Sequence, residues 1–237
     1  MTESPATETP ATADDETTQS RGFVGRRTAS RSDIRDVYAD QADMMARLNW
    51  LNRGLTGRYR RLFGRAEGRV LDVACGTGLN ARYLPEDTEY VGIDLSPDML
   101  EKAKRTLDGL GREATLREMD AEDLDFPDDS FDTVISSLST CTFPNPREAL
   151  SEMNRVCKPD GRVLLVEHGR SSVGPIARFQ DWRADAHYEK HACRWNQDPA
   201  ALVAESDLEP VAIETALLGI ITTVEARPGS PAVLRDR

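Results

Sequence analysis

Apolar and polar residues recur along this chain with two different periods. Short apolar and β-branched runs are typical of buried strands, and they cover residues 69–73, 91–94, 114–119, 131–136 and 162–167. Apolar positions three and four residues apart predict amphipathic helices over 32–48, 55–63, 97–110 and 146–156, with a short helix after Asp198. Ser32, Ser96 and Asn145 have side chains that cap helix N-termini, and Gly111 is a typical helix end.

The order of these elements predicts the fold class. Strands alternate with helices from 69 to 168, which indicates an α/β fold built on a doubly wound, mostly parallel sheet. Pro159 and Gly161 predict a turn into the last parallel strand, and two further strands, 209–218 and 220–227, would meet at Gly219 as an antiparallel hairpin. Ligands bind such sheets in the crevice at the carboxyl ends of the strands.

Length and composition indicate a single domain. With 237 residues, of which 39% are hydrophobic, the chain has enough apolar side chains for one core over 22–237. Residues 1–21 are mainly Thr, Ala, Glu, Asp and Pro, so we expect a disordered acidic tail. No basic leader with an apolar run and no stretch of roughly 20 apolar residues is present, which favours a cytoplasmic protein without a transmembrane segment. The four scattered cysteines are expected to be reduced.

The charge of the chain bears on its partners and its environment. A formal net charge of −11 argues against nucleic-acid binding, which requires many lysines or arginines on one face. Only four of the 30 basic residues are lysine, beside 41 acidic residues, and this balance favours a protein adapted to high salt. A GC-rich genome explains the excess of arginine equally well, whereas it does not explain the acidity.

A glycine-rich turn follows the first predicted strand. Gly76 and Gly78 let backbone approach a ligand closely, and Asp94 follows Gly76 by eighteen positions, near the roughly 20-residue spacing at which an acid reaches a ribose. The pattern 76–81 also matches the dinucleotide fingerprint of NAD-dependent enzymes. Asp72 inside the strand and Asp120 in a later polar segment argue against NAD, so the turn indicates a different nucleoside ligand.

With these residues, the segment 69–167 resembles the class I S-adenosylmethionine-dependent methyltransferases, whose first motif is similar to 70–78 here. The resemblance implies a Rossmann-like sheet of seven strands closed by the C-terminal hairpin, and S-adenosylmethionine as the cofactor. In that family the first motif holds the methionine moiety, the acid after the second strand holds the ribose, and later positions contact the adenine or border the methyl group. The cofactor-binding residues implied here are Asp72, Ala74, Cys75, Gly76, Gly78, Asn80, Asp94, Leu95, Met99, Asp120, Ala121, Ser136 and Ser137.

The same resemblance narrows the methyl acceptor. Segments 126–132 and 155–161 are similar to ubiquinone/menaquinone biosynthesis methyltransferases and to enzymes that methylate phospholipid nitrogen, while 167–171 and 191–196 resemble a branch that includes membrane-associated thiol methyltransferases. The Asn/Asp-Pro-Pro-aromatic motif of nucleic-acid N-methyltransferases is absent from 136–141. We therefore expect a small-molecule, quinone or lipid-like acceptor. An NAD-dependent oxidoreductase and a non-catalytic cofactor-binding subunit are the alternatives.

Residues outside the cofactor motifs are candidates for the acceptor side. His168 follows the fifth strand and is the candidate general base, with a structural histidine as the alternative. The segment 174–196 carries Ile176, Phe179 and Trp182 at helical spacing, which predicts a lid, a contact with a membrane surface, or packing on the sheet edge. Tyr38 and Tyr59 on the N-terminal helices (32–64) are candidate pocket residues, with packing against the sheet as the favoured alternative. His187, His191 and Cys193 have the spacing of metal ligands, but we expect no metal, because a fourth ligand is missing.

Overall fold

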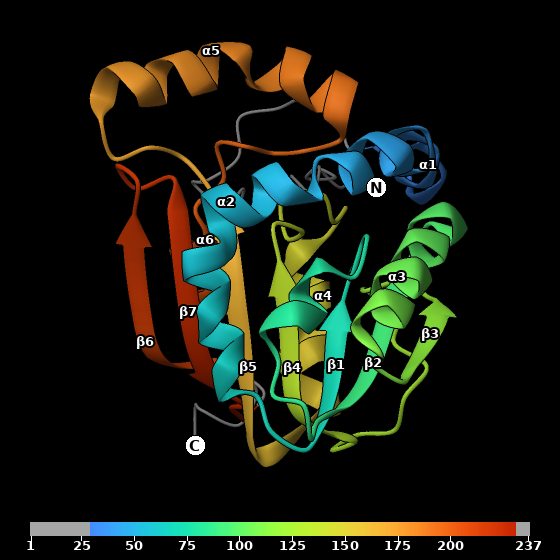
Figure 1. The fold of residues 1–237 in the computed structure, drawn as a ribbon. Coiled ribbons are helices and arrows are strands. Elements are labelled where there is room, and N and C mark those ends of the chain that lie inside the picture. Colours follow the sequence, from blue (N-terminus) through green and yellow to red (C-terminus); the bar gives the residue numbers. More distant parts are fainter. Residues whose placement is uncertain (1–28, 231–237) are drawn as a thin grey trace, which may run out of the picture.

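The computed structural model describes residues 29–230 and contains one seven-stranded sheet (Figure 1). The strands are β1 (Arg69–Val73), β2 (Glu89–Asp94), β3 (Ala114–Glu118), β4 (Phe131–Ser137), β5 (Cys157–His168), β6 (Glu209–Ala216) and β7 (Ile221–Arg227). They are ordered β3-β2-β1-β4-β5-β7-β6, and β7 alone is antiparallel to its neighbours. The predicted fold class, with its antiparallel C-terminal hairpin, is confirmed. The acidic tail lies outside the described residues.

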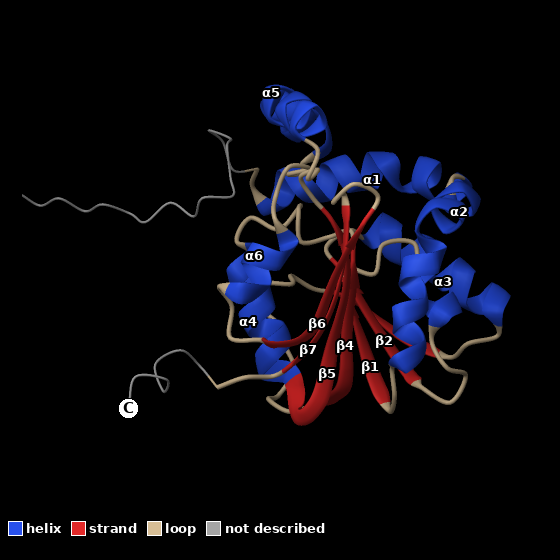
Figure 2. Ribbon diagram, turned by 90° about the vertical axis from the view of Figure 1, so that its left-hand side faces the viewer, coloured by secondary structure: helices blue, strands red, loops and turns tan. Residues whose placement is uncertain are grey.

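Helices cover both faces of the sheet and its upper end (Figure 2). The helices α4 (Pro146–Val156) and α6 (Pro199–Ala204) lie on one face, whereas α3 (Pro97–Leu110) and α2 (Asn49–Arg60), with the 3-10 helix Arg61–Arg65, lie on the other. The helices α1 (Arg31–Arg47) and α5 (Gly174–His191) lie across the carboxyl ends of the parallel strands. No helix among the described residues is long and apolar enough to span a bilayer.

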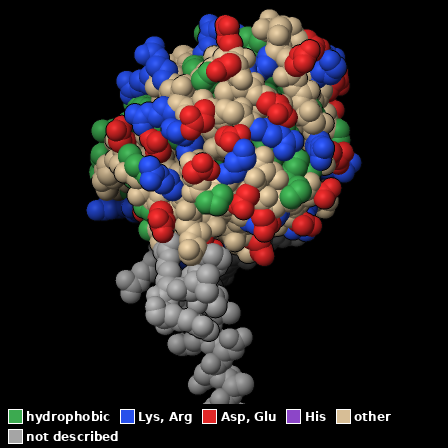
Figure 3. Space-filling model, turned by 90° about the horizontal axis from the view of Figure 1, so that it is seen from below, with side chains coloured by type: hydrophobic (Ala, Val, Ile, Leu, Met, Phe, Trp, Pro, Cys, Tyr) green, Lys and Arg blue, Asp and Glu red, His purple; other side chains and the backbone are tan. Residues whose placement is uncertain are grey.

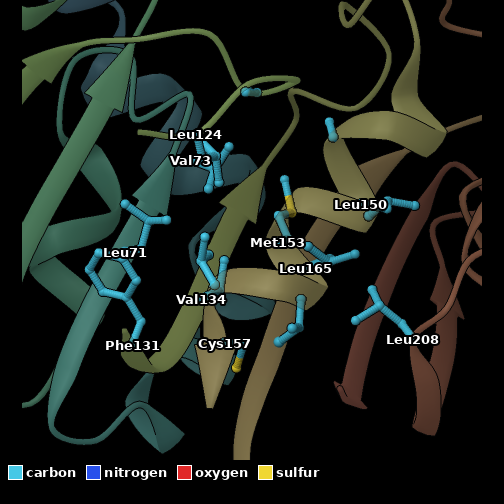
Figure 4. Packing of buried hydrophobic residues seen from close by; sticks show 14 of the residues in the cluster. Leu71, Val73, Leu124, Phe131, Val134, Leu150, Met153, Cys157, Leu165 and Leu208 are labelled. Atoms are coloured by element: carbon cyan, nitrogen blue, oxygen red, sulfur yellow. The ribbon is translucent and has the colours of Figure 1, made fainter. Parts of the chain in front are cut away.

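Both faces of the central strands are buried, as their nearly continuous apolar runs require. In β1, Leu71 and Val73 pack toward α4, while Val70 packs into the second cluster, beside α3. Figure 4 shows the first cluster, in which Leu150 and Met153 of α4 are fully buried against β4 and β5. Truncating such a side chain to alanine costs about 2–5 kcal/mol. This rigid core fixes where each strand ends.

The first helix begins two residues earlier than the sequence suggested. Ser30, not Ser32, is the N-cap: its hydroxyl accepts from the Asp33 amide at 3.2 Å, and the Asp33 carboxylate accepts from the Ser30 amide at 3.0 Å. This reciprocal pair satisfies two free amides at once, which a single serine cannot do. The second N-terminal helix likewise begins at Asn49 rather than at residue 55.

Two other elements differ from the prediction. The glycine turn leads only into a 3-10 helix (Leu79–Tyr83), because Leu84 precedes Pro85 and a residue before proline disfavours helical backbone. Residues 158–161 belong to β5 rather than to a turn. A register shift opposite Phe131 accommodates them, and Lys158 pairs with Asp132 at 2.6 Å.

Candidate functional site

A pocket opens at the carboxyl ends of β1, β2 and β4, beneath α1 and α2. Its walls come from both helices, from the turns after the three strands and from the segment after β3. Of the predicted cofactor residues, the pocket is lined by Ala74, Cys75, Gly76, Asn80, Asp94, Leu95, Met99, Asp120, Ala121 and Ser137. Asp72, Gly78 and Ser136 are not among the lining residues.

The glycine turn and Asp94 form one hydrogen-bonded unit. The Asp94 carboxylate accepts from the Gly76 amide at 2.8 Å and from the Ser96 amide at 2.9 Å. Gly78 has φ +74, and a Cβ there would lie 3.1 Å from the Ala103 Cα, so its lack of a side chain lets the turn pack against α3. Burial raises the pKa of Asp94 to about 6, while its amide hydrogen bonds oppose the shift. The turn therefore presents a carboxylate with a nearly neutral pKa to the pocket.

Asp72 lies under the pocket floor and does not touch the cavity. Its carboxylate is fully buried and accepts from Asn80 Nδ2 at 2.9 Å and from the Tyr90 hydroxyl at 2.7 Å. Burial raises the pKa of Asp72 to about 6. Because Asn80 donates to Asp72, the amide oxygen of Asn80 faces the pocket side. Asp72 thus orients Asn80, which lines the pocket.

Arg60, at the end of α2, is a buried cation that the sequence reasoning missed. Its guanidinium lines the pocket and donates to the Asn80 amide oxygen at 3.0 Å, the Ser137 hydroxyl at 3.1 Å and the Thr56 hydroxyl at 3.2 Å. These acceptors are all neutral, and burial lowers the pKa of Arg60. A buried cation held by neutral oxygens is suited to bind a ligand carboxylate.

The opposite end of the pocket is formed by residues after β2 and β3. Leu95, Met99 and Ala121 line an apolar wall next to Asp120, whose carboxylate forms an ion pair with Arg31 of α1. Arg31 also reaches Glu122 at 3.3 Å, so α1 is tied to the segment after β3. The sequence reasoning did not identify Arg31, because its partners lie about ninety positions away.

The serines at the end of β4 and in the following loop have separate roles. Ser137 lines the pocket, but Ser136 is buried behind it and donates to the Val73 carbonyl at 3.0 Å. Ser139, within the polar run 136–141, lines the adjoining wall with Thr142 and Phe143, which the sequence reasoning did not single out.

The predicted acceptor-side residues are only partly brought to the pocket. Tyr38 lines it, and burial raises the pKa of Tyr38 well above its usual value, whereas Tyr59 is partly buried against the second hydrophobic cluster. His168 is not a lining residue. Its ring lies against Cys141 and Cys193. Burial by itself lowers the pKa of His168, but the hydrogen bond to Cys193 and the charges of Cys193 and Glu167 together raise it. In α5, His187 stacks on Trp195 with ring centroids 4.3 Å apart.

The pocket fits the three parts of S-adenosylmethionine. Arg60 would take the carboxylate of the methionine moiety, Asp94 the ribose hydroxyls, and the wall of Leu95 and Met99 the adenine ring, with Asp120 at the ring's polar edge. The fit rests on two features: at one end the buried Arg60 guanidinium donates only to neutral oxygens among residues 29–230, and at the other end lies an apolar slot.

Comparisons with known proteins agree with this fit. The family model described as "Methyltransferase domain" matches residues 71–165. The phosphatidylethanolamine N-methyltransferase of Cereibacter sphaeroides is 38% identical over 148 residues, which are 61% of this chain and 71% of that protein. The demethylmenaquinone methyltransferase of Renibacterium salmoninarum is 38% identical over 135 residues, and the match covers 53% of this chain and 54% of that protein.

Solved structures share the fold. A methyltransferase from Bacillus halodurans superposes with a TM-score of 0.61 at 20% identity, covering 73% of this chain and 98% of that one. The geranyl diphosphate C-methyltransferase of Streptomyces coelicolor, solved with S-adenosyl-L-homocysteine, gives a TM-score of 0.58 at 16% identity, covering 74% of this chain and 75% of that one. These findings do not favour an NAD-dependent oxidoreductase.

Proposed function

We propose that this chain, which belongs to the class I S-adenosylmethionine-dependent methyltransferases, methylates a lipid-like acceptor, a quinone or a phospholipid, that it takes from a membrane surface. Its cofactor is S-adenosylmethionine, which supplies an electrophilic methyl group when bound. The residues of the chain then have to hold the acceptor in line with that group and exclude water. Ser137, Ser139 and Phe143 line the wall at which this alignment would occur.

The distribution of exposed apolar side chains carries the proposal. Among the described residues, most large hydrophobic side chains with high exposure lie on the helices and the turn that surround the pocket end of the sheet (Figure 1). They are Met44, Leu48, Trp50, Leu51, Leu55, Phe179, Trp182, Leu217 and Leu218, whereas Val211 and Ile213 lie on the edge strand β6. Trp182 is 74% exposed and Trp50 is 68% exposed. The opposite end of the molecule mixes acidic and basic side chains with few hydrophobic ones (Figure 3).

The chemistry of this apolar rim suits a lipid surface. Tryptophan and phenylalanine insert at the level of lipid headgroups, and burying one such side chain contributes about 1.5–3 kcal/mol. On α5, Arg178 and Arg183 are exposed beside Phe179 and Trp182, and the Arg183 guanidinium lies 5.5 Å from the Trp182 ring centroid. Arginines next to inserted aromatic residues attract anionic headgroups. The acceptors in the names of the two relatives, phosphatidylethanolamine and demethylmenaquinone, are of this lipid class.

Methyl transfer from labelled S-adenosylmethionine tests the proposal directly. The protein is incubated with vesicles that contain phosphatidylethanolamine, an anionic phospholipid and a demethylated quinone, and the labelled product is identified by mass spectrometry. We expect label in the lipid fraction. Label found exclusively in water-soluble metabolites of a cell extract would refute the lipid assignment.

Matched variants test the role of the rim. Phe179→Ser and Trp182→Ser should raise the KM for an acceptor embedded in vesicles and leave kcat for a short-chain soluble analogue unchanged. Val211→Ser, on the edge strand, is the control with a similarly exposed apolar side chain, and its KM should equal that of the wild type. Equal KM values for all three variants would show that the rim does not contact the membrane.

A further inference from the structure

Three sulfur and nitrogen ligand atoms from distant parts of the chain meet beside the pocket. Cys141 lies in the loop after β4, His168 ends β5, and Cys193 follows the C-terminus of α5. His168 Nε2 is 3.2 Å from Cys141 Sγ and 3.4 Å from Cys193 Sγ, and the two sulfurs are 3.3 Å apart. Both cysteines are buried. Among the histidine, cysteine and acidic side chains of residues 29–230, these three have ligand atoms that all lie within 4.8 Å of one another, close enough to share a metal ion.

The backbone holds these residues together independently of the thiols. The Arg194 amide donates to the Cys141 carbonyl at 2.8 Å, and the Arg194 guanidinium donates to the Phe143 carbonyl at 2.6 Å. Buried Glu167 accepts from the amides of Ser139 and Thr140 at 3.0 and 3.3 Å, which fixes the loop that carries Cys141. Hydrogen bonds therefore position the ligand atoms before any metal is bound, as a preorganised site requires.

The distances agree better with a shared metal ion than with a disulfide. A disulfide brings its sulfurs to about 2.05 Å, well below the separation here. Zinc binds sulfur at about 2.3 Å and nitrogen at about 2.0–2.1 Å, so tetrahedral ligand atoms lie roughly 3.5–3.8 Å apart, a few tenths of an ångström beyond the observed values. Two thiolates and an imidazole also select zinc over magnesium and calcium, which take oxygen ligands.

We propose that Cys141, Cys193 and His168 bind one Zn²⁺ ion through two thiolates and one imidazole. Both cysteines would bind the ion as thiolates, so their two negative charges balance the two positive charges of Zn²⁺ and the buried site is neutral overall. Three protein ligands leave the fourth tetrahedral position for water or another external ligand. Ser139 and Thr142, on either side of Cys141, line the pocket, so the ion would tie this wall to the segment after α5.

This set differs from the one that sequence spacing suggested. His187 and His191 lie one helical turn apart on α5, with ring centroids 4.8 Å apart. His187 interacts with Cys193, but neither histidine belongs to the group whose ligand atoms all lie within 4.8 Å of one another. Cys141 and His168 replace them because β4 and β5 are neighbouring parallel strands whose carboxyl ends lie side by side. That juxtaposition is a property of the sheet and has no local sequence signal.

Metal analysis of the full chain tests the site without reference to methyl transfer. Protein purified under reducing conditions without a metal-affinity step should contain about one equivalent of zinc. After chelation, titration with Co²⁺ should produce a thiolate-to-cobalt charge-transfer band that saturates at about one equivalent. Cys193→Ser and His168→Gln should lose the zinc and weaken the band, whereas Cys157→Ser should keep both. Cys157 is the matched control because it is buried at the opposite end of β5.

Three outcomes would overturn the proposal. One is wild-type protein that contains no zinc and gives no thiolate band with Co²⁺, a result that does not depend on whether a variant folds. Another is equal loss of the band in Cys157→Ser and Cys193→Ser. The third is a disulfide between Cys141 and Cys193 in protein prepared anaerobically, which would assign the pair to redox chemistry.

Discussion

Replacing Asp94 by asparagine tests the polar centre of the cofactor pocket. The Asp94 carboxylate accepts the Gly76 and Ser96 amides and would accept the two ribose hydroxyls of S-adenosylmethionine. A hydrogen bond to a charged group is worth about 1.5–3 kcal/mol and a neutral one about 0.5–1.5 kcal/mol, so two ribose bonds lose about 2–3 kcal/mol in Asp94→Asn. That loss corresponds to a rise in Kd of about 30- to 160-fold.

The pH dependence of binding gives an independent check on the same residue. Because burial raises the pKa of Asp94 to about 6, the free protein gains a proton there as the pH falls through about 6. A protonated carboxyl group is a weaker acceptor, so wild-type affinity should fall by up to about tenfold per pH unit below pH 6 and be constant above pH 7. In Asp94→Asn this group no longer titrates, so the loss of affinity below pH 6 should be smaller, with buried Asp72 as the group that still titrates near pH 6.

Isothermal titration calorimetry between pH 5 and pH 8 measures both effects. Asp98→Asn, in the exposed first turn of α3, is the control for removal of one acidic charge near the pocket, and its Kd should match the wild type. A Kd for Asp94→Asn within threefold of the wild type, or a flat wild-type profile, would show that Asp94 does not hold the ribose.

Three further predictions concern the buried charges and the surface. Arg60→Met should weaken S-adenosylmethionine binding about 10- to 150-fold, because it removes one hydrogen bond between charged groups. Binding of methylthioadenosine should be unchanged, because that ligand has no carboxylate. Equal losses of affinity for both ligands would contradict the role assigned to Arg60. Asp72→Asn should stabilise the protein at pH 8 by up to about 3 kcal/mol, measured by urea unfolding. Burial raises the pKa of Asp72 in the folded state to about 6, so the wild type loses stability as the pH rises through 6. The extra stability of Asp72→Asn should therefore vanish near pH 4. If the variant is still more stable than the wild type at pH 4, the burial of the Asp72 charge is not the cause. The acidic composition predicts that Tm rises between dilute buffer and molar KCl, and a constant Tm would exclude adaptation to high salt.

The sequence predicted the parts of the site that depend on local pattern. The buried run of β1, the glycines after it and the acid that ends β2 lie within one strand-turn-strand unit, so their spacing in sequence fixes their spacing in space. The caps Ser96, Asn145 and Asp198 are local in the same sense and lie where they were expected. Ser30 was missed because either of two nearby serines can begin a helix, and the reciprocal bond to Asp33 decides between them.

The residues that the sequence did not reveal reach the site through tertiary packing. Arg60 is one of several arginines near the end of α2, and no local feature distinguishes it from Arg58, which is exposed. Its neighbours Asn80 and Ser137 follow it by 20 and 77 positions. The approach of Cys141, His168 and Cys193 depends in the same way on the pairing of β4 with β5 and on the path of the chain after α5.

Asp72 connects the sequence motif to the chemistry of the pocket although its side chain does not line the cavity. An ionised carboxylate accepts hydrogen bonds and cannot donate them. Asn80 must therefore present its amide nitrogen to Asp72 and its amide oxygen to the other side. That oxygen then accepts from both Arg60 and Ser137, which places the guanidinium at the methionine end of the pocket. Asp72 therefore determines, through the Asn80 amide, where Arg60 is held, and Arg60 is the cation that would bind the cofactor carboxylate. The unfavourable burial of the Asp72 carboxylate is the cost of this orientation.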